Sequence, residues 1–162
     1  CIALQYALDY PEEVKGLVLM TVAMRSKKRG PDALNMRLAA DKSPEAYQTW
    51  LEYQRHAMMF VDPDLRERLM GGHEKGGPIS QHDDLVVIDK FDVTDRIGDL
   101  KAPLVLIRGV DDPGAPPEYE LEIHEAVPGS KYVKLSGAGH FPMAEKPEEV
   151  NRAIEELQAR VG

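Results

Sequence analysis

The sequence predicts an α/β fold with a doubly wound, mostly parallel sheet. Three apolar runs, at 14–22, 102–109 and 131–137, have the composition of strands, and the first two lack the polar alternation of a strand with one wet face. Segments with helical periodicity precede, separate and follow these runs. Strands that alternate with helices are typical of βαβ units, in which helices cover both faces of a parallel sheet.

The first segment of the chain has helical periodicity. Ile2, Ala3, Tyr6 and Ala7 recur at helical spacing, and the pattern stops before Pro11. The segment has neither an initiator methionine nor a capping residue before it. We therefore expect the chain to start inside a helix and to be a fragment of a longer protein.

Residues 24–83 differ in composition from the rest and predict a helical insertion, or cap, between core segments at 1–23 and 84–162. The insertion is rich in Met, Arg, Lys and Gln. Its methionine and aromatic side chains either pack the cap helices against the sheet or form an adaptable apolar wall over a substrate. These residues are Met24, Met36, Trp50, Tyr53, Met58, Met59, Phe60 and Met70.

Capping signals predict several helices within this insertion. A helix is expected over 31–42, with a proline near its first turn, and another over 43–60, with Ser43 as N-cap. An Asp-Pro pair starts a further helical segment at 62–70. The glycine-rich stretch 71–78 predicts a flexible loop.

The second half of the chain alternates helices and strands. A helix near 82–90 and an amphipathic connector lead to the strand at 102–109, and a helix over 116–129 leads to the strand at 131–137. The final helix, 146–162, begins with glutamates that suit the positive end of its dipole. Its predicted core stripe consists of Val150, Ala153, Ile154, Leu157 and Val161.

Composition restricts the classes of partner. The net charge of −8 argues against nucleic acid or an anionic membrane surface, and the one basic cluster, 25–30, is short enough to be a solvated loop. No apolar run approaches the roughly 18–20 residues that span a bilayer, and no signal-peptide pattern is present. Cys1 is the only cysteine, which excludes an internal disulfide and fits a reducing, cytoplasmic compartment.

Ionisable residues follow the second and third predicted strands. The loop "RGVDDPGAPPE" offers Asp111 and Asp112, and the loop "SGAGHFP" offers His140. In open parallel sheets, ligands bind outside the carboxyl ends of the strands, where these loops meet. An aspartate there can fix the tautomer of an imidazole and stabilise its charged form, as in two-thirds of a nucleophile–base–acid triad.

These two loops closely resemble the acid and histidine loops of α/β-hydrolases. "LVLIRGVDDPGAPPE" has a strand ending in Gly-x-x-Asp, and "LSGAGHFPMAEKPEEV" matches the histidine loop and the helix after it. The resemblance implies that Asp112 is the triad acid and His140 the base, with Asp111 as the alternative acid if the loop register differs. "CIALQYALDYPEEVKGLVLM" resembles the helix and strand after the nucleophile elbow, so the chain corresponds to the C-terminal portion of the fold.

The nucleophile elbow itself is absent from the sequence. The family pattern Gly-x-Ser-x-Gly does not occur, and none of the serines, Ser26, Ser43, Ser80, Ser130 and Ser136, lies on a predicted strand-to-helix turn. We expect an N-terminal segment of the same protein to carry the serine and to pair with the exposed sheet edge, without which residues 1–162 aggregate. Cys1 as a thiol nucleophile is a poorer interpretation, because it lies inside a helical pattern.

The resemblance implies a serine hydrolase that cleaves a small-molecule carboxylic ester or lactone through an acyl-enzyme. The alternatives are a proline-iminopeptidase-like enzyme with a peptide-like substrate, a carbon–carbon bond hydrolase, or a non-catalytic ligand-binding module. The implied mechanism needs no cofactor and no metal. A metal site built from His73, Glu74, His82, Asp83 and Asp84 is conceivable, but their spacing matches no ligand motif and a solvated loop explains them better.

Overall fold

The computed structural model describes residues 1–26, 39 and 42–162. It divides the chain into two compact units. Residues 1–25 and 92–162 form an α/β unit, and residues 26–91 form a helical unit. The sequence places the insertion at 24–83, whereas the last helix of the helical unit runs on to Lys90.

The α/β unit is built on three parallel strands. These are β1 (Leu17–Met20), β2 (Leu104–Gly109) and β3 (Lys131–Leu135), in the order β1-β2-β3. Leu17 pairs with Leu104, and Gly109 pairs with Leu135. The predicted parallel sheet is therefore confirmed, and the carboxyl ends of β2 and β3 lie at the same edge of the sheet.

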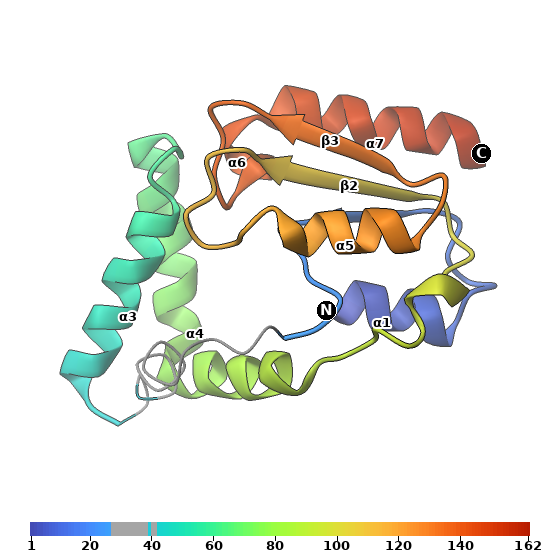
Figure 1. The fold of residues 1–162 in the computed structure, drawn as a ribbon. Helices are drawn as coiled ribbons and strands as arrows, with labels where there is room; N and C mark the ends of the chain where they lie inside the picture. Colours follow the sequence, from blue (N-terminus) through green and yellow to red (C-terminus); the bar gives the residue numbers. More distant parts are fainter. Residues whose placement is uncertain (27–38, 40–41) are drawn as a thin grey trace. The chain divides into compact units, whose positions relative to one another are not determined.

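Helices cover the sheet on both faces (Figure 1). The unit contains α1 (Ile2–Asp9), α5 (Glu118–Ala126), the single turn α6 (Pro142–Glu145) and α7 (Pro147–Val161), together with the short 3-10 helix η2 (Ile97–Asp99). In Figure 1, α7 lies behind the sheet and α5 in front of it. Among the residues described, no helix combines the length and apolar character needed to cross a membrane.

Alternation along β2 sends its side chains to two different layers. Val105 and Ile107 join a core cluster with Val150, Ala153 and Leu157 of α7. The predicted stripe of α7 is thus confirmed, with Ile154 and Val161 packed at the margin of this cluster. Arg108 projects to the opposite face, where it contacts α5.

The helical unit contains α3 (Pro44–Ala57) and α4 (Pro63–Lys90) among its described residues. Ser43 caps α3 as predicted, because its hydroxyl accepts a hydrogen bond from the amide of Ala46 at 3.1 Å. Trp50 stacks on Tyr53 in a small cluster that includes Leu85. The helix predicted over 31–42 lies outside the described residues, apart from 39 and 42.

The loop predicted at 71–78 is wrong for most of its length. The helix continues through these glycines, and its break is confined to Gly77, with φ 71° and ψ 172°, directly before Pro78. Such a φ suits glycine, and a proline cannot donate the next helical hydrogen bond. The helix forms here despite the poor helix propensity of glycine, and the hydroxyl of Tyr47 on α3 donates to the carbonyl of His73 at 3.3 Å.

Candidate active site

The structure brings together an aspartate and a histidine from the two loops that the sequence singled out. Asp112 lies three residues beyond the end of β2, and His140 five residues beyond the end of β3. The His140 Nδ1 lies 2.9 Å from Asp112 Oδ2. The Asp112 side chain is fully buried, whereas 32% of the His140 side chain is exposed, so one member is held inside and the other can meet a solute.

Hydrogen bonds and charge keep Asp112 ionised despite its burial. Its second oxygen, Oδ1, accepts a hydrogen bond from the amide of Gly114 at 2.6 Å. Burial alone would raise the pKa of the Asp112 carboxyl, but the contacts with His140 and Gly114 and the positive charge of Arg108 outweigh it and lower the pKa. A carboxylate held in this way stabilises a protonated imidazole and fixes Nδ1 as the donor, which leaves Nε2 to take up a proton.

The two loops are joined through their backbones beneath this pair. The amide of Val110 donates to the carbonyl of Leu135 at 3.0 Å, and the amide of Asp111 donates to the carbonyl of Ala138 at 2.9 Å. Gly109 lies where they cross, and a Cβ at this position would approach Ala138 O to 2.5 Å and come closer still to Gly139 O. Only glycine therefore permits this approach of the loops.

Asp111, the alternative acid, has a different place in the structure. It is exposed, and its carboxylate accepts a hydrogen bond from the amide of Gly137 at 2.9 Å. Gly137 has φ 67°, so this contact holds a turn that glycine favours, just before the histidine. Asp111 thus binds the histidine loop, while Asp112 contacts the histidine.

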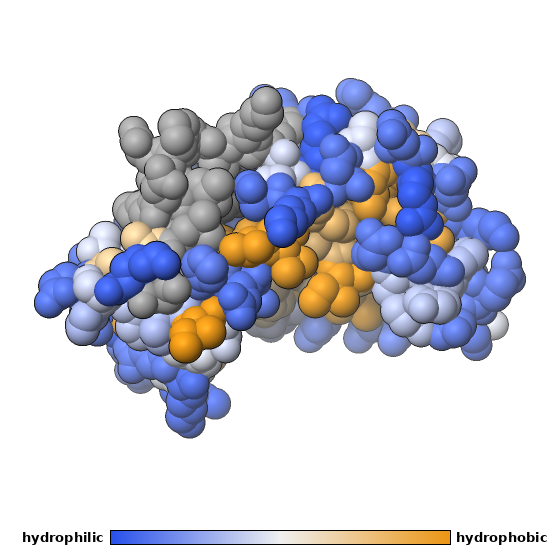
Figure 2. Space-filling model, turned by 90° about the horizontal axis from the view of Figure 1, so that it is seen from below, coloured by the Kyte–Doolittle hydropathy of each residue, from blue (hydrophilic) through white to orange (hydrophobic). Residues whose placement is uncertain are grey.

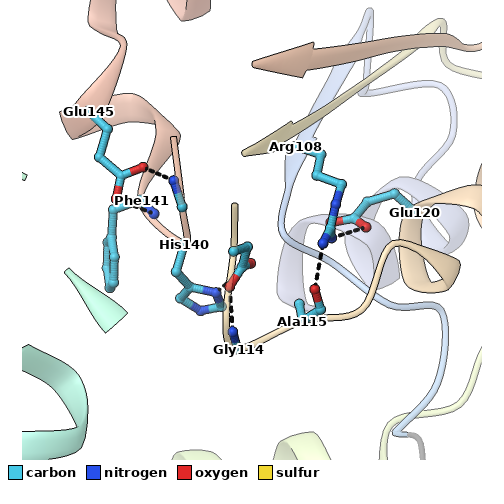
Figure 3. Close-up of polar contacts among 9 residues, drawn as sticks. Arg108, Gly114, Ala115, Glu120, His140, Phe141 and Glu145 are labelled. Carbon is cyan, nitrogen blue, oxygen red and sulfur yellow. Dashed lines mark hydrogen bonds and ion pairs between the residues drawn. The ribbon is translucent and has the colours of Figure 1, made fainter. Parts of the chain in front are cut away.

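Glu145 braces the histidine from the other side, a role that sequence reasoning missed. Its carboxylate accepts hydrogen bonds from the amides of Gly139, at 2.5 Å, and Phe141, at 3.4 Å, the two residues that flank His140 (Figure 3). Burial raises the pKa of Glu145, and the two amides offset this only in part. The Phe141 ring packs edge-on against the imidazole, with centroids 5.3 Å apart.

A buried ion pair lies behind the acid loop and was also missed. Arg108 and Glu120 are joined by a 3.0 Å contact, and their side chains are 5% and 0% exposed (Figure 3). The sequence signal was a single arginine in an otherwise apolar strand, with a glutamate in the first turn of the next helix. Burial raises the pKa of Glu120, although the positive charge of Arg108 opposes this.

The candidate metal ligands of the sequence do not gather into a site. In the part of the chain that the structure describes, no group of three or more His, Cys, Asp or Glu side chains is placed to hold a metal ion. His73 instead contacts the side-chain amide of Gln81, and His82 contacts the neighbouring Asp83. Cys1 lies at the start of α1; it is partly buried, and its thiol forms no disulfide.

Comparisons with known proteins agree with this architecture. The family model described as "alpha/beta hydrolase fold" matches residues 1–147. A 2-hydroxy-6-oxo-6-phenylhexa-2,4-dienoate hydrolase of Comamonas testosteroni is 25% identical over 98% of this chain, and a proline iminopeptidase of Lactobacillus delbrueckii subsp. bulgaricus is 25% identical over 90% of it. A solved structure of a thermophilic esterase from Thermogutta terrifontis superposes with a TM-score of 0.82 at 26% identity over 99% of this chain.

The chain is shorter than each of these proteins. It covers 59% of the Comamonas hydrolase, 57% of the iminopeptidase and 61% of the esterase.

Proposed function

Since the chain belongs to the α/β-hydrolase fold family, we propose that it forms the acid–base half of a serine hydrolase that cleaves a carboxylic ester or lactone through an acyl-enzyme. The observation that carries the proposal is the 2.9 Å contact between the buried Asp112 and the partly exposed His140 at the carboxyl end of the sheet. The similarity to an esterase over nearly the whole chain supports the choice of substrate class.

In the proposed reaction, His140 Nε2 takes the proton of a serine hydroxyl as the oxygen attacks the substrate carbonyl. It then returns the proton to the leaving alkoxide. Asp112 fixes the imidazole in the productive tautomer and stabilises its charged form. In a second step His140 deprotonates a water molecule, which attacks the acyl-enzyme; His140 then returns this proton to the departing serine oxygen, and the acid is released.

We assign the nucleophile to a segment of the same protein that precedes Cys1. β1 pairs with β2 on one side, and its other edge has no strand partner among the described residues. Figure 2 shows hydrophobic side chains on the surface seen from below. Ile2, at the start of α1, is 84% exposed. An unpaired strand edge and exposed apolar surface favour a further strand beside β1. Residues 1–162 without such a strand are then inactive as an esterase.

The relatives favour a second candidate within the same family, a hydrolase that cleaves a carbon–carbon bond or a peptide-like substrate instead of an ester. A carbon–carbon bond hydrolase and a proline iminopeptidase each match at least 90% of the chain. The same aspartate–histidine pair can serve these reactions, so the bond cleaved depends on the residues that bind the substrate. A non-catalytic ligand-binding module is the remaining alternative. The proposal also places the protein in the cytoplasm, as its single cysteine suggests.

The test is turnover by the complete protein, with Asp111 as a matched control for Asp112. We expect hydrolysis of short acyl p-nitrophenyl esters and covalent labelling by a fluorophosphonate. Asp112→Asn should lower kcat by about 10³- to 10⁴-fold, whereas Asp111→Asn, which keeps an oxygen for Gly137, should retain most of it. Labelling with turnover of prolyl amides or vinylogous diketones but not of esters would favour the second candidate, and ligand binding without labelling would favour the binding module.

A further inference from the structure

Arg108 occupies an unusual position for a charged side chain. It is the penultimate residue of β2, a strand in which every residue is buried, and Arg108 itself is 4% exposed. Arginine is rarely buried to this extent unless it is paired, because its charge loses hydration. A specific set of contacts must therefore hold it there.

The guanidinium makes two contacts that close the acid loop. Nη1 donates to Glu120 Oε2 at 3.0 Å, and Nη2 donates to the carbonyl of Ala115 at 2.7 Å. Arg108 precedes the loop, Ala115 lies within it, and Glu120 follows it on α5, as Figure 3 shows. One planar group thus ties the strand, the loop and the helix together.

This closure lies next to Asp112 along the chain. The amide of Gly114 donates to Asp112 Oδ1 at 2.6 Å, and the carbonyl of the next residue, Ala115, is the one that Arg108 holds. Residues 114–115 therefore bind Asp112 through the amide of Gly114 and are bound by Arg108 through the carbonyl of Ala115. A Cβ on Gly114 would lie 3.3 Å from Asp112 Oδ1 and 3.4 Å from His140 Nδ1, so this segment also packs against the pair.

We propose that Arg108 and Glu120 form a clamp that positions Asp112, and through it the ring of His140, for the hydrolysis proposed above, on which this inference rests. Both are positioning residues, because neither contacts the histidine directly in the structure. The clamp acts by fixing the acid loop between Gly114 and Ala115, and the positive charge of Arg108 favours the ionised form of the aspartate.

The energetics argue against a purely structural role. Two buried charges lose their hydration, and replacing such a pair by apolar residues of similar size is often neutral or stabilising. Among the described residues, Glu120 Oε1 has no hydrogen-bond partner, which adds to the cost of keeping this carboxylate inside. If the ion pair served only stability, apolar residues of similar size would stabilise the protein as well or better at this position.

The main test replaces both members of the pair in the complete protein, as Arg108→Met with Glu120→Leu. The matched control is Arg25→Met with Glu122→Leu, which removes the 3.3 Å ion pair between Arg25 and the same helix α5. Three quantities are measured for each variant: the Tm, the low-field proton resonance of His140 Nδ1–H, and kcat with KM for an ester. The resonance is assigned from its loss in His140→Ala.

We expect the Arg108/Glu120 variant to remain folded, to lose or broaden the His140 resonance, and to show a kcat lower by about 10- to 100-fold with little change in KM. Because the clamp acts through Asp112, the same replacement should cause no further fall in kcat in an Asp112→Asn background. The control variant should keep both the resonance and kcat.

A folded variant with an intact resonance and an unchanged kcat would overturn the clamp, even if the wild-type protein hydrolyses esters. A wild-type protein without ester turnover would contradict the proposed function, while loss of the resonance in the variant would still support the clamp. Should the double variant fail to fold, Arg108→Lys keeps the charge but not the two-pronged geometry. An unchanged resonance and kcat in that variant would refute the proposal.

Discussion

Replacing Gly109 by alanine should separate the two loops that carry Asp112 and His140. The added Cβ would lie 2.5 Å from the carbonyl oxygen of Ala138 and 2.6 Å from its carbonyl carbon. Ordinary contacts of a Cβ begin at 3.4 Å, so the loops must move apart by at least about 0.9 Å at Ala138 O, and by more at Gly139 O, which would lie closer still. The obstructing atoms are backbone, and no side-chain rotation can relieve the clash.

The movement has two measurable consequences. It stretches the hydrogen bond from Asp111 to Ala138, and overpacking of this kind costs about 2–3 kcal/mol, which lowers the Tm by roughly 4–12 °C for a protein of this size. It also lengthens the 2.9 Å contact between Asp112 and His140 to well beyond hydrogen-bond distance. A misplacement of about 1 Å in a catalytic group can lower kcat by about 10²-fold.

The assay is thermal unfolding followed by circular dichroism, together with kcat for an ester on the folded variant of the complete protein. Gly98→Ala is the control, because a Cβ on this glycine of η2 meets no atom within 4 Å. A Gly109→Ala protein whose Tm and kcat both match those of Gly98→Ala would refute the reasoning, since the loops would then tolerate the side chain that the structure excludes.

Three further predictions concern the core, the histidine loop and the helical unit. Ile107→Ala, at a fully buried position of β2, should lower the free energy of unfolding in urea by about 2–5 kcal/mol, whereas Ile79→Ala, at a 70% exposed position of α4, should change it by less than about 0.5 kcal/mol; equal effects would contradict the assigned core. Burial raises the pKa of Glu145 in the folded protein, so the free energy of unfolding of the wild-type protein, relative to that of Glu145→Gln, should increase as the pH is lowered from neutral through that pKa. If urea titrations show that this difference in free energy stays constant or falls as the pH is lowered, the carboxyl of Glu145 does not have a raised pKa. Ser43→Ala should destabilise the start of α3 by about 1 kcal/mol, seen as faster amide hydrogen exchange at Ala46, and unchanged exchange there would show that the cap does not hold.

The sequence alone predicts most of the α/β unit. Long apolar runs bounded by glycine and proline mark the strands at 102–109 and 131–137, and their order relative to the helices implies a parallel sheet. Since the carboxyl ends of parallel strands share an edge, the juxtaposition of Asp112 and His140 follows from the pattern once the strands are placed.

The parts that the sequence did not predict depend on contacts between distant residues. The glycines at 71, 72 and 76 favour a loop by local propensity, yet they lie in a helix, which Tyr47 of α3 contacts at the carbonyl of His73. The choice of Asp112 over Asp111 as the acid came instead from the family resemblance, and in the structure Asp112 contacts His140 while Asp111 contacts Gly137. Arg108 and Glu145 form hydrogen bonds with backbone atoms of the loops. An amino-acid sequence does not show which backbone atoms a side chain will contact.

The distribution of buried charge links the stability of this unit to its chemistry. Among the described residues, the buried charged residues are Arg108, Asp112 and Glu120, and all three lie between the end of β2 and the first turn of α5. Apolar residues would fill these positions at lower cost in desolvation. Violations of the rules for a stable core are expected at functional sites, where position and charge matter more than stability. The cost is therefore concentrated beside His140, where the reaction proposed here requires an ionised carboxylate in a fixed position.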